Sequence, residues 1–316
     1  MTRPVLTITL NPALDQTVIL DHLRVGEVNR ARSCMCHAGG KGVNVASCLA
    51  DWDAEGVAAT GVLGVENQAP FTTLFAAKAI TDGFVRVPGE TRTNIKLSHD
   101  GDTTDINLPG LSLSADDLSA LGKKIGSLVA PEGLVLLAGS LPEGVTPFIY
   151  PHLAEQIAAC GAQVLADSSG APLRAILEGS VMPYVIKPNR EELEGFVDHK
   201  LEDDDALLRA ARGLNARGVV LVVVSLGAEG ALFVTAEAAL RAYVMPLRVI
   251  STVGAGDAMM AGIIAALRES AGLERIARLA TAFAVGKLTR PGASLPPRPE
   301  IEALADDVQV TQMTKI

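Results

Sequence analysis

The sequence is poor in aromatic residues and has no long apolar runs. Aromatic side chains make up only 3% of the 316 residues, whereas 48% of all residues are hydrophobic. A core built from small aliphatic side chains suits close-packed α/β layers better than a β-sandwich rich in aromatics. No apolar run is long enough to span a bilayer, and the N-terminus lacks an apolar leader with a cleavage site. We therefore expect a cytoplasmic protein with no membrane partner.

Cysteine is also scarce, with only four residues in the chain: Cys34, Cys36, Cys48 and Cys160. The first two form a C-x-C pair, which could mark a metal or redox site. No other pair has the spacing of a zinc site. We expect small, buried or half-buried thiols in a reducing compartment.

Positive charge is outnumbered, because 27 Lys and Arg residues face 36 Asp and Glu residues, which gives a formal net charge of -9. An acidic surface argues against binding to DNA or to anionic lipid, so we expect no nucleic-acid partner. It does not exclude an anionic small substrate. A few local cations can outweigh a distant mean field.

Short apolar runs alternate with helical patterns along most of the chain. The runs, such as VVLVVVSLG at residues 219–227, are continuous, as in strands that are covered on both faces. The helical patterns between them, such as SADDLSALGKKIGSLV at residues 114–129, predict an α/β fold. Its expected form is a doubly wound, mostly parallel sheet flanked by helices.

Residues 12–38 and 89–108 break this rhythm. The second segment reads as a hairpin, with TNIKLS and TTDINL on either side of HDGD. We predict that short antiparallel strands from both segments form a small β-sheet over one edge of the core. The core would then comprise residues 1–11, 39–88 and 109–316. The small sheet is either a lid or a simple extension of the fold.

The stretch STVGAGDAMMAGIIAAL, residues 251–267, places two glycines and one aspartate before an apolar helix. A strand over residues 242–251 is predicted to lead into it. Gly254 and Gly256 permit a tight turn, after which unpaired N–H groups and the helix dipole form an anion hole. Asp257 either caps the helix or accepts the proton of a hydroxyl that attacks a phosphoryl group.

Two other motifs each allow two interpretations. HAGGKGVNVAS, residues 37–47, lacks the Walker A pattern. Its glycine turn with Lys41 and Asn44 holds either a polyol or phosphate, or is an ordinary strand-to-helix turn. In KPNREEL, Asn189 and Glu192 share a helix face. They either hold the water shell of Mg²⁺ or form a capping box, which the residues alone favour.

The remaining motifs are a turn and a lid strand. Residues 224–234 read as two strands around a glycine turn, which either covers a nucleotide or is a plain hairpin. Arg92, Asn94 and Lys96 lie at period two and share one face of a strand. That face is either solvated, or it turns Arg92 toward a phosphate.

In combination, these motifs resemble a known family. AGGKGVNVA, AGSLPEGV, KPNREEL, SLGAEGAL and STVGAGDAMMAG occur in the order seen in the PfkB, or ribokinase-like, carbohydrate kinases. The resemblance runs from TITLNPALD to RPGAS. NPALD, VGEVNRA, HAGGKG, TRTNIKL and LADSSGAPL resemble the branch that acts on fructose 1-phosphate.

The resemblance implies a ribokinase-like core with a β-sheet lid that often supports a homodimer, and it implies ATP and Mg²⁺. The expected reaction moves the γ-phosphoryl group of ATP to the C6 hydroxyl of fructose 1-phosphate. The alternatives are kinases of the same family that act on tagatose 6-phosphate or fructose 6-phosphate. A sugar-phosphate sensor that no longer catalyses is a further alternative from a different class.

The resemblance also assigns roles to individual residues. Asp257 is expected to be the general base, beside an anion hole formed by Gly254, Ala255 and Gly256. Nucleotide contacts are expected at Lys187, Asn189, Ser225, Gly227, Ala228, Glu229, Gly230 and Thr252, and magnesium contacts at Asn189 and Glu192. Substrate contacts are expected at Asp15, Gly39, Gly40, Lys41, Asn44, Arg92, Asn94 and Ser140. Among these, Lys41 and Arg92 are expected to hold the phosphate of the sugar.

The resemblance leaves three regions open. A monovalent cation such as K⁺ would involve the loops around Ser251 and Ser294. Trp52 and Asp53 stand where relatives have a Leu-Gly turn, which leaves the loop shape open. Lys287 and Arg290 lie in a region that lines the adenine pocket in relatives.

Overall fold

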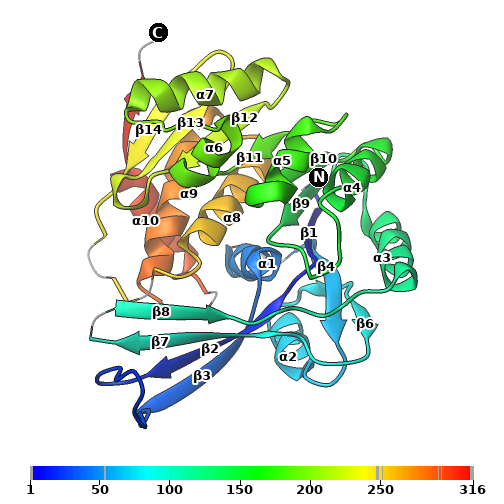
Figure 1. Cartoon of the computed structure of the whole chain (residues 1–316). Coiled ribbons are helices and arrows are strands. Elements are labelled where there is room, and N and C mark those ends of the chain that lie inside the picture. Colours follow the sequence, from blue (N-terminus) through cyan, green and yellow to red (C-terminus); the bar gives the residue numbers. More distant parts are fainter. Residues whose placement is uncertain are drawn as a thin grey trace.

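Two β-sheets of unequal size organise the molecule (Figure 1). The computed structural model describes residues 3–52, 55–100, 102–246, 249–250, 252–290, 292 and 294–313. The strands of the large sheet are β1 (Val5–Thr9), β4 (Val57–Gly64), β5 (Thr81–Asp82), β6 (Val85–Val87), β9 (Leu134–Ala138), β10 (Gln163–Asp167), β11 (Val185–Ile186), β12 (Leu221–Ser225), β13 (Ala231–Val234), β14 (Ala239–Tyr243) and β15 (Gln309–Gln312).

The large sheet is mostly parallel, as expected. Its order is β15-β14-β13-β12-β11-β10-β9-β1-β4-β5, and β6 also pairs with β4. All pairings from β12 through β1 to β5 and β6 are parallel, whereas β12 to β15 form an antiparallel extension. Parallel strands need crossover connections, which the helices supply.

Helices cover both faces of the large sheet. One face carries α1 (Lys41–Trp52), α2 (Ala69–Ala77), α8 (Ala255–Arg268), α9 (Leu273–Leu288) and α10 (Arg298–Asp307). The other carries α3 (Ala115–Leu128), α4 (Ile149–Ala159), α5 (Gly170–Glu178), α6 (Arg190–Val197) and α7 (Asp204–Ala216). Strand β9 shows the consequence, because Leu134 and Leu136 pack on the first face and Val135 and Leu137 on the second. A continuous apolar run therefore marks a strand that is buried on both sides.

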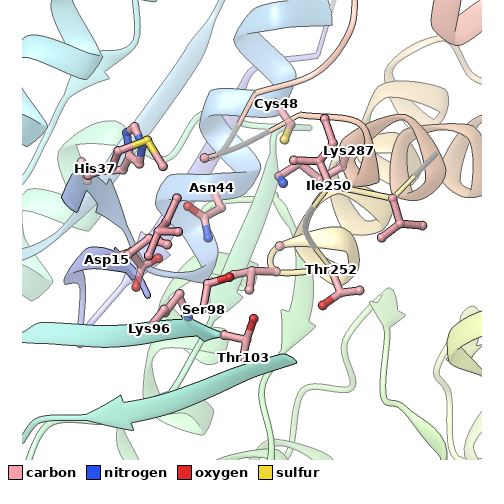
Figure 2. Close-up of a pocket in the computed structure, with 18 of the residues that line it drawn as sticks. Asp15, His37, Asn44, Cys48, Lys96, Ser98, Thr103, Ile250, Thr252 and Lys287 are labelled. Atoms are coloured by element: carbon pink, nitrogen blue, oxygen red, sulfur yellow. The ribbon is translucent and has the colours of Figure 1, made fainter. Parts of the chain in front are cut away.

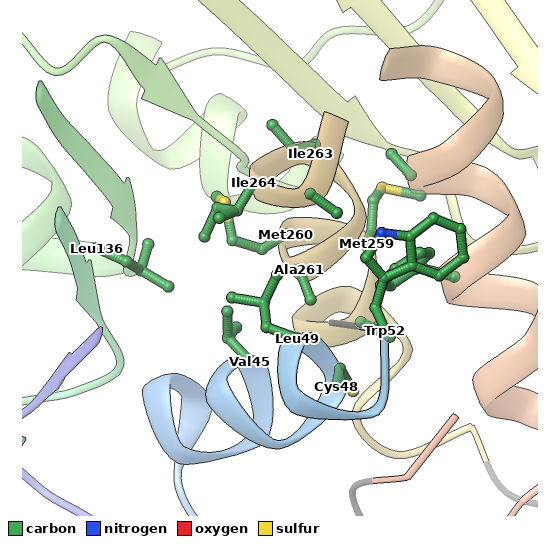
Figure 3. Packing of buried hydrophobic residues seen from close by; sticks show 14 of the residues in the cluster. Val45, Cys48, Leu49, Trp52, Leu136, Met259, Met260, Ala261, Ile263 and Ile264 are labelled. Atoms are coloured by element: carbon green, nitrogen blue, oxygen red, sulfur yellow. The ribbon is translucent and has the colours of Figure 1, made fainter. Parts of the chain in front are cut away.

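Helices α1, α8 and α9 pack closely and fix the region that carries the candidate site (Figure 3). A Cβ atom at Gly262 of α8 would lie 2.7 Å from the Cα of Ala280 in α9, so only glycine permits this approach. Trp52 is the last residue of α1, and its ring lies 5.1 Å from that of Phe283 in α9. Asp53, which follows it, is outside the described residues.

The small sheet has the order β3-β2-β7-β8, formed by β3 (Ser33–Gly39), β2 (Ala13–Ile19), β7 (Thr93–His99) and β8 (Asp102–Asn107). Figure 1 shows it beside the start of α1, below the helical layer. Its two hairpins are antiparallel, but β2 and β7 pair in parallel, so the expectation of antiparallel strands was wrong at this pairing. The hairpins are β2-β3 and β7-β8. Their first strands, β2 and β7, run in the same direction, so they pair in parallel where the two hairpins meet. The division into core and lid stays a prediction.

Two other local expectations were wrong. Strand β14 ends at Tyr243, and residues 244–246 and 249–250 lie outside any strand. Pro246 explains the break, since proline cannot donate to a strand ladder. Cys34 and Cys36 are exposed rather than buried, because β3 is an edge strand of the small sheet. Within the described ranges, none of the helices has both the length and the apolarity needed to cross a bilayer.

Candidate active site

The start of α8 is built around a glycine in the left-handed region. Gly254 is the N-cap residue with φ of 81°, and no side chain caps the helix. Asp257, the third residue of α8, is buried and accepts a hydrogen bond of 2.8 Å from Asn44 Nδ2. Capping by Asp257 is therefore wrong as an interpretation. The Ala255 N–H makes one long hydrogen bond of 3.5 Å, to the Thr252 carbonyl oxygen, so the start of the helix can still bind another acceptor, and the helix dipole favours an anion there.

The carboxyl group of Asp257 is poised near neutral pH. Burial raises its pKa to about 6, and the negative charge of Asp167 adds to the rise. Lys41, the hydrogen bond from Asn44, and Lys187 act in the opposite direction without cancelling it. A carboxylate with a pKa just below the working pH is ionised and still basic enough to take a proton in a transition state.

Asp167 connects the two lysines beside Asp257. It ends β10 and is fully buried, with Lys41 Nζ 2.8 Å from Oδ1 and Lys187 Nζ 3.3 Å from Oδ2. Burial opposes ionisation, yet the two ammonium groups hold the pKa of Asp167 below its usual value. Sequence reasoning missed this residue. The available signal was a carboxylate at the end of a buried strand, where ligands of parallel sheets gather.

Lys187 reaches from β11 to the first turn of α8. A Cβ atom on Gly256 would lie 3.3 Å from Lys187 Nζ. Lys41 opens α1, and although burial lowers the pKa of Lys41, attraction by Asp167 and then Asp257 raises it overall. The fold thus gathers one basic carboxylate, two cations and a helix N-terminus. Such a group can hold a phosphoryl group and accept a proton from a hydroxyl.

Asn189 and Glu192 form a capping box at the start of α6. Asn189 Oδ1 accepts from the Glu192 N–H at 2.7 Å, and Glu192 Oε2 accepts from the Asn189 N–H at 2.9 Å. Asn189 also bridges to Ser225 at the end of β12. Throughout the described ranges, no group of three or more His, Cys, Asp or Glu side chains could hold a metal ion. The magnesium contact stays a prediction, and it requires ligands from water or substrate.

The glycine turn at residues 224–234 is a hairpin between β12 and β13. A short 3₁₀ helix, η1 (Gly227–Glu229), connects the strands, and Gly227, Ala228 and Glu229 are exposed. Gly230 has φ of 87°, and a Cβ there would lie 2.1 Å from the carbonyl oxygen of Ala242. The turn is therefore open to a ligand on one side and tightly packed on the other.

A cavity of about 410 Å³ separates the small sheet from the start of α8 (Figure 2). The small sheet lines it with polar side chains, including Asp15, Lys96 and Ser98. The core contributes residues from α1, α9 and the segment before α8: Asn44, Cys48, Val249, Ile250, Thr252, Val253, Gly254 and Lys287. Asn44 and Gly254 thus connect the cavity to Asp257.

The lid residues predicted to bind substrate fall into two groups. Asn94 Nδ2 donates to Asp15 Oδ1 at 3.3 Å, and burial raises the pKa of Asp15 although Lys96 opposes this. Lys96 itself lies 3.3 Å from Asp105. Arg92 instead donates to the main-chain oxygens of Asn11 and Pro12, at 3.1 and 3.3 Å. Lys96, and not Arg92, is the lid cation that lines the cavity.

Close contacts surround Gly39 and Gly40, which precede α1, and a hydrogen bond holds Ser140. A Cβ atom on Gly39 would lie 2.4 Å from Asp15 Oδ2, and Gly40 has φ of 109°. Ser140 follows β9, is exposed, and accepts a hydrogen bond of 3.2 Å from Asn11 Nδ2. Ser140 is not among the residues that line the cavity.

The loops expected to hold a monovalent cation are only partly described. Ser251 lies outside the described residues. Ser294 Oγ is 3.5 Å from Lys78 Nζ, which also donates to Asp51 at 2.8 Å.

The chain is similar to known proteins over nearly its whole length. The family model for the pfkB family carbohydrate kinases matches residues 8–301. The 1-phosphofructokinase of Xanthomonas campestris is 50% identical over 91% of this chain and 92% of its own length. That of Rhodobacter capsulatus is 42% identical over the full length of both chains.

Among solved structures, phosphofructokinase-2 from Escherichia coli in complex with potassium has a TM-score of 0.88 and 28% identity, covering 97% of this chain and 99% of its own. The same E. coli protein is also known in complex with fructose-6-phosphate and in a tetrameric inhibited form.

Proposed function

The chain belongs to the pfkB family of carbohydrate kinases, and we propose that it phosphorylates fructose 1-phosphate at the C6 hydroxyl to give fructose 1,6-bisphosphate. It is a phosphotransferase whose second substrate is ATP. The relatives named 1-phosphofructokinase are 50% and 42% identical, and their matches extend over nearly the whole chain. The observation that carries the proposal is the buried carboxyl of Asp257, with a pKa of about 6, at an uncapped helix start.

Asp257 is the proposed general base. Its carboxylate takes the proton of the C6 hydroxyl while the oxygen forms its bond to the γ-phosphorus of ATP and the bond to the leaving β-phosphate oxygen breaks. Asn44 holds the carboxylate by a hydrogen bond of 2.8 Å. This contact fixes the orientation of the base, which the reaction requires before transfer begins.

The proposed phosphoryl site combines the start of α8 with Lys187. Gly254, Ala255 and Gly256 supply main-chain N–H groups, and Lys187 lies against the first turn. These donors stabilise charge that develops on the transferring group. Asn189 and Glu192 offer oxygen atoms that suit a hydrated Mg²⁺, which when bound neutralises phosphate charge.

The remaining nucleotide contacts are proposed at the carboxyl ends of β11 and β12. Ser225 bridges to Asn189 there, and the exposed residues 227–229 begin the adjoining turn. Thr252 lines the cavity on the approach to α8. Ligands of parallel sheets bind at this edge because the carboxyl ends of the strands and the helix starts meet there.

The sugar phosphate is proposed to bind between the lid and α1. Asp15, Asn44 and Asn94 offer acceptors and donors for hydroxyl groups, and glycines 39 and 40 give the chain room to approach. Lys41 and Arg92 are the proposed contacts to the phosphate, together with Lys96, which points into the cavity (Figure 2). Closure of the lid would exclude water and so suppress hydrolysis of ATP.

We propose a cytoplasmic homodimer that associates through the lid. The edge strand β8 supports this proposal, since Ile106 is 44% exposed and Leu108, just after the strand, is 40% exposed. Exposed apolar residues on a sheet edge favour association. Sedimentation of the purified protein, with and without an Ile106→Lys change, tests the dimer.

A substrate panel tests the function. We expect the highest kcat/KM with fructose 1-phosphate, compared with fructose 6-phosphate and tagatose 6-phosphate at matched ATP and Mg²⁺. A preference for either 6-phosphate would assign the chain to one of the alternative kinases. Binding of sugar phosphates without turnover of any would favour the sensor.

A further inference from the structure

Lys287 is a buried lysine to which the proposed reaction gives no role. It lies in the last turn of α9 with 1% of its surface exposed. Its ammonium donates one hydrogen bond of 3.0 Å, to the main-chain oxygen of Arg290. Among the residues that the structure describes, no carboxylate forms an ion pair with it. Most buried ammonium groups are paired, so this one needs an explanation.

The end of the Lys287 side chain lies close to Gly254, the residue that begins the anion hole. A Cβ atom on Gly254 would be 3.5 Å from Lys287 Cε, and Lys287 lines the same cavity as Thr252 and Val253. Figure 2 shows its nitrogen on the side that faces Asn44. The residue therefore places a positive charge at the N-terminus of α8.

This placement is unfavourable unless an anion arrives. The helix dipole already makes the start of α8 positive, and a second positive charge there is repelled. Burial lowers the pKa of Lys287, and the opposing influences of Cys48 and Asp257 do not restore it. A phosphate group bound at the anion hole would compensate both charges, so the lysine contributes most when substrate is present.

In the described part of the neighbouring loop, two oxygen atoms already contact ammonium groups. The main-chain oxygen of Arg290 accepts from Lys287, and Ser294 Oγ lies 3.5 Å from Lys78 Nζ. A K⁺ ion bound at these two oxygens would therefore have to compete with two ammonium groups that are part of the protein. The E. coli relative, by contrast, has a structure in complex with potassium.

We propose that the Lys287 ammonium is a built-in cation of the anion hole, which replaces a bound monovalent cation and makes the reaction of this chain independent of K⁺. Lys287 is a positioning residue: it acts through the segment at residues 252–254 and not by contact with the transferred group. The inference rests on the proposed kinase function.

The first test compares wild-type turnover in KCl, NaCl and tetramethylammonium chloride at equal ionic strength. We expect rates within about twofold, since the required charge is already in the protein. A wild-type enzyme that loses most of its activity without K⁺ overturns the proposal. Absence of turnover in every salt would count against the proposed function instead.

The second test removes the ammonium. Lys287→Ala leaves space for an ion, so we expect turnover to fall at least about tenfold in tetramethylammonium chloride and to recover in KCl. Its Tm should also rise specifically with KCl, whereas the wild-type Tm should not. Acquired K⁺ dependence separates this role from simple packing. If Lys287→Ala keeps wild-type turnover, or loses it without any K⁺ effect on rate or Tm, the proposal is wrong.

Lys200→Met is the matched control. Lys200 is exposed and pairs with Glu194, and neither residue lines the cavity, so its removal should change neither the rate nor its ion dependence.

Discussion

Replacing Asp257 by Asn should inactivate the enzyme and stabilise the protein at the same time. The carboxyl is buried and its pKa is raised from 3.8 to about 6, so the folded state holds its proton more tightly than the unfolded state. Ionisation therefore costs stability above the folded pKa, by roughly 3 kcal/mol for a shift of about two units. Asn carries no charge and still offers an oxygen to Asn44.

The gain should depend on pH in a defined direction. Above about pH 6 the wild type bears the full cost, so the variant should be more stable by up to roughly 3 kcal/mol. As the pH falls from about 6 to below 3.8, the carboxyl becomes protonated first in the folded and then in the unfolded state, and the difference should disappear. Urea unfolding near pH 8 measures the full gain, and near pH 4.5 the gain should have fallen to about 1 kcal/mol.

Kinetics of the same variant test the chemistry. Turnover of fructose 1-phosphate should fall about 10²–10⁴-fold, with binding of the sugar phosphate retained. Asp116→Asn is a control, because Asp116 is an exposed first-turn aspartate of α3; it should lose at most about 1 kcal/mol and keep its activity. Turnover within a few-fold of wild type, or a stability gain that is equal at both pH values, would refute the reasoning.

Further predictions concern neighbouring groups. The wild-type kcat/KM should decline below about pH 6 as Asp257 takes up a proton. Asp167→Asn leaves the buried Lys187 and the half-buried Lys41 without their shared carboxylate, so unfolding should be easier by about 3–5 kcal/mol. The same change removes a charge that raises the pKa of Asp257, so the acidic limb of the pH profile should move to lower pH; an unmoved limb would contradict the coupling. Gly254→Ala forces a Cβ into a φ of 81° and should cost about 1–2 kcal/mol by thermal unfolding. Gly195→Ala in α6, where a Cβ meets open space, should be neutral or stabilising. Lys96→Met should raise KM for fructose 1-phosphate about tenfold with a smaller effect on kcat, and an unchanged KM would remove Lys96 from the phosphate site.

Much of the architecture was determined locally by the sequence. Continuous apolar runs identified strands buried on both faces, and the hairpin at residues 93–107 followed from its turn. The glycines before Asp257 predicted a helix start without a side-chain cap. Glycine adopts the left-handed backbone conformation seen at Gly254 without help from distant residues, so this feature could be predicted from the local sequence. Such features depend mainly on residues that are adjacent in the chain, so they can be predicted from the sequence.

Only the tertiary structure decided which charges meet. Lys41 and Asp167 are 126 residues apart, and Asn44 and Asp257 are 213 apart, yet both pairs lie within 2.8 Å. The pKa of Asp257, the cavity-facing position of Lys96 and the burial of Lys287 all arise from such long-range contacts. Electrostatic energy depends on the distance between charges and on their burial. Neither quantity can be obtained from the order of residues, because both are set only when the sheet and its helices pack together.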